Sequence, residues 1–163
     1  MSSKSESNHV LCAIDVNDYD PQVVELAAEF AVQLGAQLDL LHVSDAPDPN
    51  TAAWPAYLGA PNVVAEDHAI LDMIDCQVEG MMLRKHHLIG NPTQKILGFA
   101  ERNPPVLLVM GTHGRQGLQR IFGSVASRVL RRAECPVVVL RQRKKKNDEP
   151  SDSRTETQGH PIS

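Results

Sequence analysis

Several residue types and patterns are scarce in this chain, and each scarcity removes a class of protein. Aromatic residues make up only 4% of the 163 residues and apolar residues 42%, so the core must be largely aliphatic, as in many α/β domains with parallel sheets. No apolar run reaches about 18 residues, and the N-terminal segment MSSKSESNH is polar, so we expect neither a membrane span nor a secretory signal. The net charge of −4 argues against nucleic-acid binding through an overall positive field.

Cysteine is also scarce. Cys12, Cys76 and Cys135 are odd in number and lack the spacing of metal ligands. We interpret them as buried, reduced thiols in a cytoplasmic protein. The length of the chain suits one domain with a substantial core.

The stretch of residues 106–140 carries the most informative pattern. Its two ends, 106–110 and 137–140, are short apolar runs that predict buried strands. Between them, apolar residues at helical spacing over 125–133 predict a helix with Ser124 as its N-cap, and Pro136 ends this helix. The segment that joins the first strand to the helix is rich in glycine, with Gly111, Gly114, Gly117 and Gly123.

A strand, a glycine-rich loop and a helix N-terminus together form an arrangement that binds phosphate. Glycines allow close approach of the backbone and positive φ, and the helix N-terminus adds unpaired N–H groups with partial positive charge. No Gly-Lys-Ser/Thr closes this loop, so it is not a Walker A element, and it lacks the G-x-G-x-x-G dinucleotide fingerprint. The alternative is that the glycines only shape a long connection between strand and helix.

The rest of the chain alternates between strand and helix patterns, which predicts a doubly wound, parallel, five-stranded α/β sheet. The expected strands are 9–14, 38–43, 81–89, 106–110 and 137–140. The expected helices are 21–34, 63–78, 92–102 and 124–133.

Asp15 ends the first predicted strand, where open α/β sheets bind ligands. Two roles remain open for it: contact with a ligand, or capping of the turn through Asn17 and Asp18. His42, inside an apolar strand, is expected to be a packed core histidine.

No metal site is predicted. Four acidic residues wrap around the second helix and are expected to form a solvated face: Asp67, Asp72, Asp75 and Glu79. His86 and His87 are adjacent on a strand, so they point to opposite faces and cannot jointly bind one ion. Their charged strand suits a sheet edge.

Three motifs resemble the universal stress protein family: Gly111-Thr112-His113-Gly114, Gly123-Ser124-Val125-Ala126, and the run from Cys135 to Val139. The resemblance covers residues 9–142. The ATP-binding pattern of that family is Gly, two residues, Gly, nine residues, then Gly-Ser or Gly-Thr. This chain has eight residues, 115–122, where that pattern has nine.

The resemblance implies a Rossmann-like fold of the adenine-nucleotide alpha-hydrolase type with strand order 3-2-1-4-5. It implies a regulator of the stress response that binds ATP, with Mg²⁺ on the phosphates. The alternatives are a nucleotide-free dimeric adaptor and a slow ATPase, and no catalytic residue is assigned. The nucleotide-binding residues that it implies are Asp15, Val43, Met110, Gly111, His113, Gly114, Arg115, Gly123, Ser124 and Val125.

The predicted domain organisation is a flexible arm at 1–8, a universal stress protein domain at 9–142 and a disordered polar tail at 143–163. The apolar strand 137–141 lies at the sheet edge in the implied order, and pairing of two copies through it would give a homodimer. A protein partner of unknown identity is expected, with no nucleic-acid or membrane partner.

Overall fold

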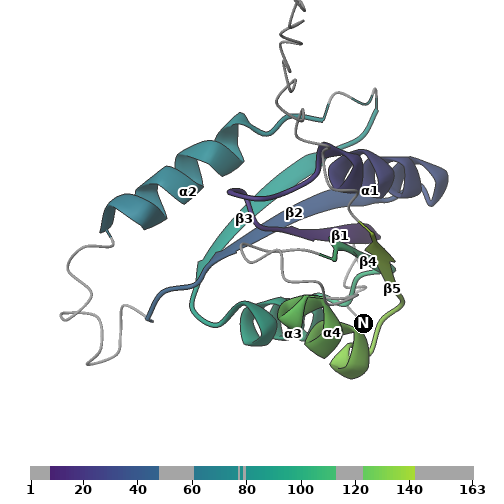
Figure 1. Ribbon diagram of the computed structural model, residues 1–163. Coiled ribbons are helices and arrows are strands. Elements are labelled where there is room, and N and C mark those ends of the chain that lie inside the picture. The colour runs from purple at the N-terminus through teal and green to yellow at the C-terminus, as the bar shows by residue number, and fades with distance from the viewer. Residues whose placement is uncertain (1–7, 48–60, 77, 79, 113–122, 142–163) are drawn as a thin grey trace, which may run out of the picture.

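The computed structural model describes residues 8–47, 61–76, 78, 80–112 and 123–141. Over these residues, strands and helices alternate along the chain (Figure 1). The strands are β1 (His9–Ile14), β2 (Gln37–Ser44), β3 (Leu83–Ile89), β4 (Leu107–Gly111) and β5 (Val137–Leu140). The helices are α1 (Pro21–Gln33), α2 (Pro61–Met73), α3 (Pro92–Arg102) and α4 (Ser124–Arg132).

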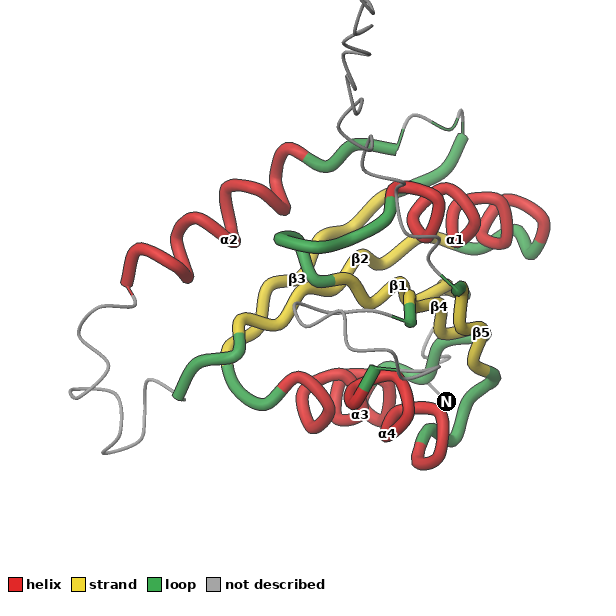
Figure 2. Tube along the Cα trace, viewed as in Figure 1, coloured by secondary structure: helices red, strands yellow, loops and turns green. Residues whose placement is uncertain are grey.

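The strands form one parallel sheet in the order β3-β2-β1-β4-β5. Helices α1 and α2 lie on one face of the sheet and α3 and α4 on the other (Figure 2). The predicted doubly wound, Rossmann-like fold and its strand order are therefore confirmed. The two edges are β3 and β5, as the sequence predicted.

β1 is the centre of the sheet and is buried on both faces. Val10 and Cys12 pack into the core cluster beneath α1, and Leu11 and Ala13 pack into the cluster beneath α3 and α4. None of these four residues is more than 5% exposed. The near-continuous apolar sequence of this strand follows from that double burial, because a parallel strand covered by helices has no solvent face.

Helices α1 and α3 begin where the sequence signals indicated. Asp20 caps α1 by accepting a hydrogen bond from the Gln22 N–H at 3.0 Å, and Asn91 caps α3 by accepting one from the Gln94 N–H at 3.1 Å. Both caps precede a proline, whose missing N–H costs nothing in the first turn.

Several boundaries differ from the prediction by one or two residues, and the end of α2 differs by five. α2 ends at Met73 rather than near residue 78, because the Ile74 N–H bonds the Leu71 carbonyl at 3.2 Å in a tighter closing turn. β3 begins at Leu83 rather than Met81, because Met81 belongs to a turn in which its N–H bonds the Val78 carbonyl at 3.2 Å. None of the described helices is long and apolar enough to cross a membrane.

Candidate functional site

The strand order reverses between β1 and β4, and the carboxyl ends of these two strands define the candidate site. β1 continues into β2 on one side, whereas β4 pairs with β1 on the other side. In this pairing Ala13 lies opposite Met110, so Asp15 and Gly111 follow at the same edge of the sheet. The structure therefore brings Asp15, Met110 and Gly111 together at the carboxyl ends of β1 and β4.

The N-terminus of α4 lies at the carboxyl end of β4. The Gly123 N–H donates a 2.6 Å hydrogen bond to the Thr112 carbonyl, and the Thr112 N–H bonds Leu140 of β5 at 2.9 Å. Thr112 is buried, so this junction is held within the protein. The first-turn amides of α4 are therefore held close to the point where β4 ends.

The N-cap of α4 is Gly123, so the prediction of Ser124 as the cap was wrong. The Gly123 carbonyl accepts the first helical hydrogen bond from the Ser127 N–H at 2.9 Å, which makes exposed Ser124 the first helical residue. Gly123 has φ −59° and ψ 159°, values open to any residue, so a left-handed conformation is not its reason for being glycine. A glycine cap has no side chain to bond the first-turn amides, which leaves them for an external acceptor.

Asp15 caps its own turn. Its Oδ1 accepts a hydrogen bond from the Asn17 N–H at 3.1 Å, and its carbonyl accepts one from the Asp18 N–H at 3.0 Å. One of the two roles that the sequence left open is thus confirmed. The side chain is half-buried, so contact with a ligand is compatible with this role.

The remaining predicted site residues fall into two groups. Val43 and Met110 are buried, 7% and 5% exposed, in the cluster beneath α3 and α4, while Val125 packs against it and is partly buried. His113, Gly114 and Arg115 lie outside the described residues.

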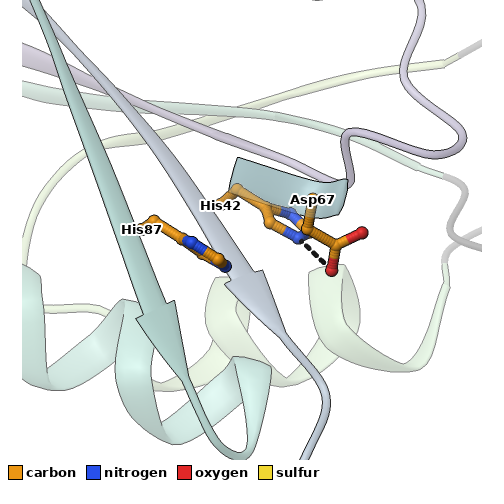
Figure 3. A group of neighbouring side chains, drawn as sticks. All are labelled: His42, Asp67 and His87. Carbon is orange, nitrogen blue, oxygen red and sulfur yellow. Dashed lines mark hydrogen bonds and ion pairs between the residues drawn. The ribbon is translucent and has the colours of Figure 1, made fainter. Parts of the chain in front are cut away.

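A polar cluster that was not predicted from the sequence lies on the face of the sheet that α1 and α2 cover. His42 comes from β2, His87 from β3 and Asp67 from α2 (Figure 3). Ser44 follows on β2. Asp67 Oδ2 lies 3.1 Å from His42 Nε2 and 2.6 Å from Ser44 Oγ, which in turn lies 2.7 Å from His87 Nε2. His42 and Asp67 are 3% and 4% exposed, so the prediction that Asp67 belongs to a solvated face was wrong.

One signal could have revealed Asp67. It precedes Leu71 by four residues and Ile74 by seven, which places it on the same face of α2 as these two core residues. His42 is buried as predicted, although it is paired with a carboxylate rather than surrounded by apolar groups alone.

The loop after β1 is bonded to this cluster. Asn17 Nδ2 donates to Asp67 Oδ1 at 2.7 Å, and the Val16 N–H lies 3.4 Å from His42 Nδ1. The Ile14 carbonyl lies 3.2 Å from the same nitrogen. The cluster and the candidate site at Asp15 are therefore connected through Ile14, which precedes Asp15, and through Val16 and Asn17, which follow it.

The pKa values of the cluster follow from burial and these bonds. Burial alone would raise the pKa of the Asp67 carboxyl, but hydrogen bonds from Ser44, Asn17 and His42 outweigh it and hold the pKa below its ordinary value. The pKa of His87 is also lowered, first by burial and then by repulsion from the neighbouring histidines. The cluster thus combines a carboxylate with an imidazole that favours its neutral form.

A second buried carboxylate, Asp39 of β2, lies on the face that α3 and α4 cover. Arg84 of β3 donates to both of its oxygens, Nε to Oδ1 at 2.6 Å and Nη2 to Oδ2 at 2.7 Å. His86 and His9 approach it at 3.4 and 3.7 Å. His86 therefore faces away from His87, as the alternation of the strand predicted.

The family can be assigned from comparisons over most of the chain. The sequence model of the universal stress protein family matches residues 6–141. Universal stress protein A homolog 1 of Coxiella burnetii is 30% identical over 139 residues, which cover 81% of this chain and 94% of that protein. Universal stress protein MJ0531 of Methanocaldococcus jannaschii is 31% identical over 143 residues, 83% of either chain.

Solved structures share the fold. The universal stress protein UspA from Lactobacillus plantarum has a TM-score of 0.63 at 24% identity, covering 83% of this chain and 98% of its own. A universal stress protein from Archaeoglobus fulgidus, solved with dAMP, has a TM-score of 0.53 at 23% identity and covers 81% and 96%. Another, solved with cAMP, has a TM-score of 0.54 at 20% identity and covers 83% and 97%. Sequence match, sheet order and structural likeness agree, and the chain belongs to the universal stress protein family.

Proposed function

We propose that this chain binds an adenine nucleotide, with ATP as its principal ligand, in the crevice outside β1 and β4, and that occupancy regulates a response to stress. The observation that carries the proposal is the N-terminus of α4. It is fixed to the end of β4 by the bond from Gly123 to Thr112, and its cap has no side chain that could occupy the amides. Amides of this kind, together with the helix dipole, bind phosphate.

Three further observations support an adenine nucleotide. Half-buried Asp15 ends the neighbouring strand and has the chemistry to accept hydrogen bonds from a ribose. Gly111, which ends β4, begins the glycine-rich segment, and His113, Gly114 and Arg115 follow it in sequence. Two structural neighbours were solved with dAMP and cAMP, which share an adenine and a phosphate.

Mg²⁺ would be held by the phosphates of ATP. Asp15 is the one predicted site residue whose carboxylate could reach such an ion, and its Oδ1 already accepts a hydrogen bond from Asn17. The ion would therefore neutralise phosphate charge. Among the residues that the structure describes, no general base beyond Asp15 is positioned at this site, so we expect at most slow hydrolysis.

Calorimetry with a pair of substitutions at Ser124 tests this function. Ser124→Pro removes one backbone N–H and keeps the helix, because proline is favoured in the first helical position and Gly123 already has the extended conformation that must precede it. Ser124→Ala removes only the hydroxyl and is the matched control.

If the amides hold a phosphate, Ser124→Pro should weaken ATP binding by about 1.5–3 kcal/mol, the usual range for a hydrogen bond to a charged group, and Ser124→Ala by about 0.5–1.5 kcal/mol. Preference for ATP over GTP is expected. Absence of any heat from ATP with the wild-type protein at millimolar nucleotide would refute the proposal, and equal affinities for all three proteins would move the phosphates away from α4.

The edge strand β5 supports a second element of the function, a homodimer. β5 pairs with β4 on one side, and its four apolar residues are all half-buried. An apolar edge strand is stabilised when it pairs with the same strand of a second copy. We propose this dimer for the nucleotide-bound protein and, as an alternative function, for a nucleotide-free adaptor. The three free thiols support the reducing cytoplasm as its location.

A further inference from the structure

Three potential metal ligands converge from three elements of the fold. His42 is on β2, His87 on the neighbouring strand β3, and Asp67 on α2 above them (Figure 3). One ligand atom from each lies within 4.8 Å of the other two. His42 Nε2 and Asp67 Oδ2 are 3.1 Å apart, close to the separation of about 3.3 Å that tetrahedral Zn²⁺ with ligand bonds of about 2.0–2.1 Å requires.

In Asp67 and His42, the side-chain atom that would face away from an ion already has a hydrogen-bond partner. Asn17 Nδ2 holds Asp67 Oδ1 at 2.7 Å, which turns Oδ2 towards the histidines. His42 Nδ1 lies 3.2 Å from the Ile14 carbonyl and 3.4 Å from the Val16 N–H, so it can donate to the first or accept from the second. When Nδ1 donates its proton to the closer Ile14 carbonyl, Nε2 presents its lone pair to an ion. Contacts of this kind orient the ligands of known metal sites.

The Ser44 hydroxyl lies among the three ligand atoms. It donates to Asp67 Oδ2 at 2.6 Å and lies 2.7 Å from His87 Nε2. The competing explanation is a purely structural network, in which His87 Nε2–H donates to Ser44 and His42 Nε2–H donates to Asp67. That network needs only one imidazole to pair with the carboxylate, yet two imidazoles stack here with ring centroids 5.4 Å apart.

We propose that His42, Asp67 and His87 bind one divalent first-row transition-metal ion of the Zn²⁺ type, with Ser44 Oγ or water at the remaining position. Two imidazoles and a carboxylate suit Zn²⁺, Fe²⁺, Co²⁺ or Ni²⁺, whereas Mg²⁺ and Ca²⁺ take oxygen ligands. On binding, each imidazole moves its proton from Nε2 to Nδ1 through solvent, so neutral rings remain neutral. This site is separate from the proposed phosphate-binding amides of α4, which lie on the other face of the sheet.

Titration of the tag-free, chelator-treated protein with Co²⁺ and Zn²⁺ tests the proposal. We expect one Co²⁺ per chain, with the visible bands of a low-coordinate ion and without the near-ultraviolet band of a thiolate ligand, and displacement by Zn²⁺. His87→Gln and Asp67→Asn should each lower the affinity roughly 10–100-fold or more. His86→Gln is the matched control, because it removes the adjacent histidine on the opposite face, and its affinity should match that of the wild type.

Absence of stoichiometric binding by the wild type, or equal affinity in His87→Gln and Asp67→Asn, would overturn the proposal. Circular dichroism in the presence of chelator shows whether each variant is folded. If one is not, anomalous diffraction from wild-type crystals grown with Zn²⁺ decides instead. A peak bonded to His42 and His87 supports the site, and a peak only at other positions, or none, refutes it.

Discussion

At the scale of single residues, the pair of Asp39 and Arg84 is strongly asymmetric. The Asp39 side chain is 2% exposed, whereas the Arg84 side chain is 38% exposed. Loss of Arg84 would leave a charge in the core with only His9 and His86 nearby, while loss of Asp39 would leave an arginine that can turn towards water. The two partners therefore contribute differently to stability although they share the same two hydrogen bonds.

We predict that Arg84→Met lowers the free energy of unfolding by about 3 kcal/mol, the lower end of the range for breaking a buried ion pair. The double substitution Arg84→Met, Asp39→Leu should recover most of this loss, because no buried charge remains. Lys85→Met is the control: Lys85 bonds only an exposed carbonyl, that of Asp72, so about 0.5 kcal/mol or less is expected. Urea denaturation measures all three, and an Arg84→Met protein as stable as the control would contradict the prediction.

The same carboxylate makes stability depend on pH. Burial raises the pKa of Asp39, but hydrogen bonds and charges from His86 and Arg84 outweigh it, so the pKa in the folded protein lies below its ordinary value of 3.8. The folded state thus binds the proton less readily than the unfolded chain does. The stabilisation is complete above the ordinary pKa and is lost as the pH falls through the folded value.

We therefore expect the urea midpoint to fall as the pH is lowered below about 4, and to fall less steeply in Asp39→Asn. The charged and titratable groups that face Asp39 are Arg84, His86 and His9. Parallel pH profiles for the two proteins would show that Asp39 does not carry the dependence.

At the scale of elements, β5 allows a sharper test of the dimer than a charged substitution. Val138 and Leu140 pack against the core cluster beneath α1, so a lysine at 138 would disturb folding as well as pairing. The Pro136 carbonyl accepts a hydrogen bond from the N–H of Leu108 in β4, and the Leu140 carbonyl accepts one from Thr112, the residue after β4. Because alternate residues of a strand point to opposite sides, the N–H and C=O of Val137 and Val139 point to the open edge.

We predict that Val139→Pro yields a monomer that keeps its fold. It removes an outward N–H that a second copy would need, and proline is tolerated where that N–H faces away from the sheet. Val138→Pro is the contrasting variant, since it removes a bond to β4 and should destabilise the monomer itself. Ultracentrifugation at tens of micromolar gives the result: a monomeric wild type, or a Val139→Pro dimer, would exclude pairing through β5.

Local signals predicted the elements well, because each depends on a few neighbouring residues. Pro21 and Pro92 indicated where α1 and α3 begin, and the apolar runs indicated β1, β4 and β5. The burial of Asp67 was not predicted, since the apolar residues of 61–73 are only weakly periodic. Packing decides which face of α2 is buried. The N-cap of α4 was missed by one residue: serine is the better cap by preference, but glycine is also accepted there, and helix boundaries are uncertain by one or two residues from sequence.

Only part of the candidate site could be predicted from the sequence. Asp15, Gly111 and the start of α4 follow from the strand order, which places their elements at one edge. The cluster of His42, Asp67 and His87 depends on contacts between residues that are 20 to 45 positions apart in the sequence. No local pattern specifies such contacts. His86 and His87 were correctly assigned to opposite faces, but His42 on the next strand, rather than His86, turned out to be the neighbour of His87.

At the scale of the whole molecule, the proposed nucleotide should stabilise the fold. A ligand that binds only the folded state at 100 times its dissociation constant adds about 2.7 kcal/mol to the free energy of unfolding. For a domain of this size we expect the melting temperature to rise by roughly 5–11 °C with saturating Mg-ATP. Scanning calorimetry measures the shift. Gly114→Val should show no shift, because the valine side chain would prevent close approach of the phosphates to the backbone. A shift of equal size in that variant would contradict binding at the glycine-rich segment.

The central position of β1 also has a consequence for the synthesis of the protein on the ribosome. When residues up to Ile89 have emerged, β1, β2 and β3 can pair and α1 and α2 can cover one face, yet β4, which completes the other side of β1, has not been synthesised. Leu11, Leu41 and Val43 then have no helix over them, because α3 and α4 come last. The half-made chain presents both a bare apolar face and an open edge strand, β1, the features that attract aggregation and chaperones. Aggregation is therefore a greater risk for the half-made chain than for the finished domain.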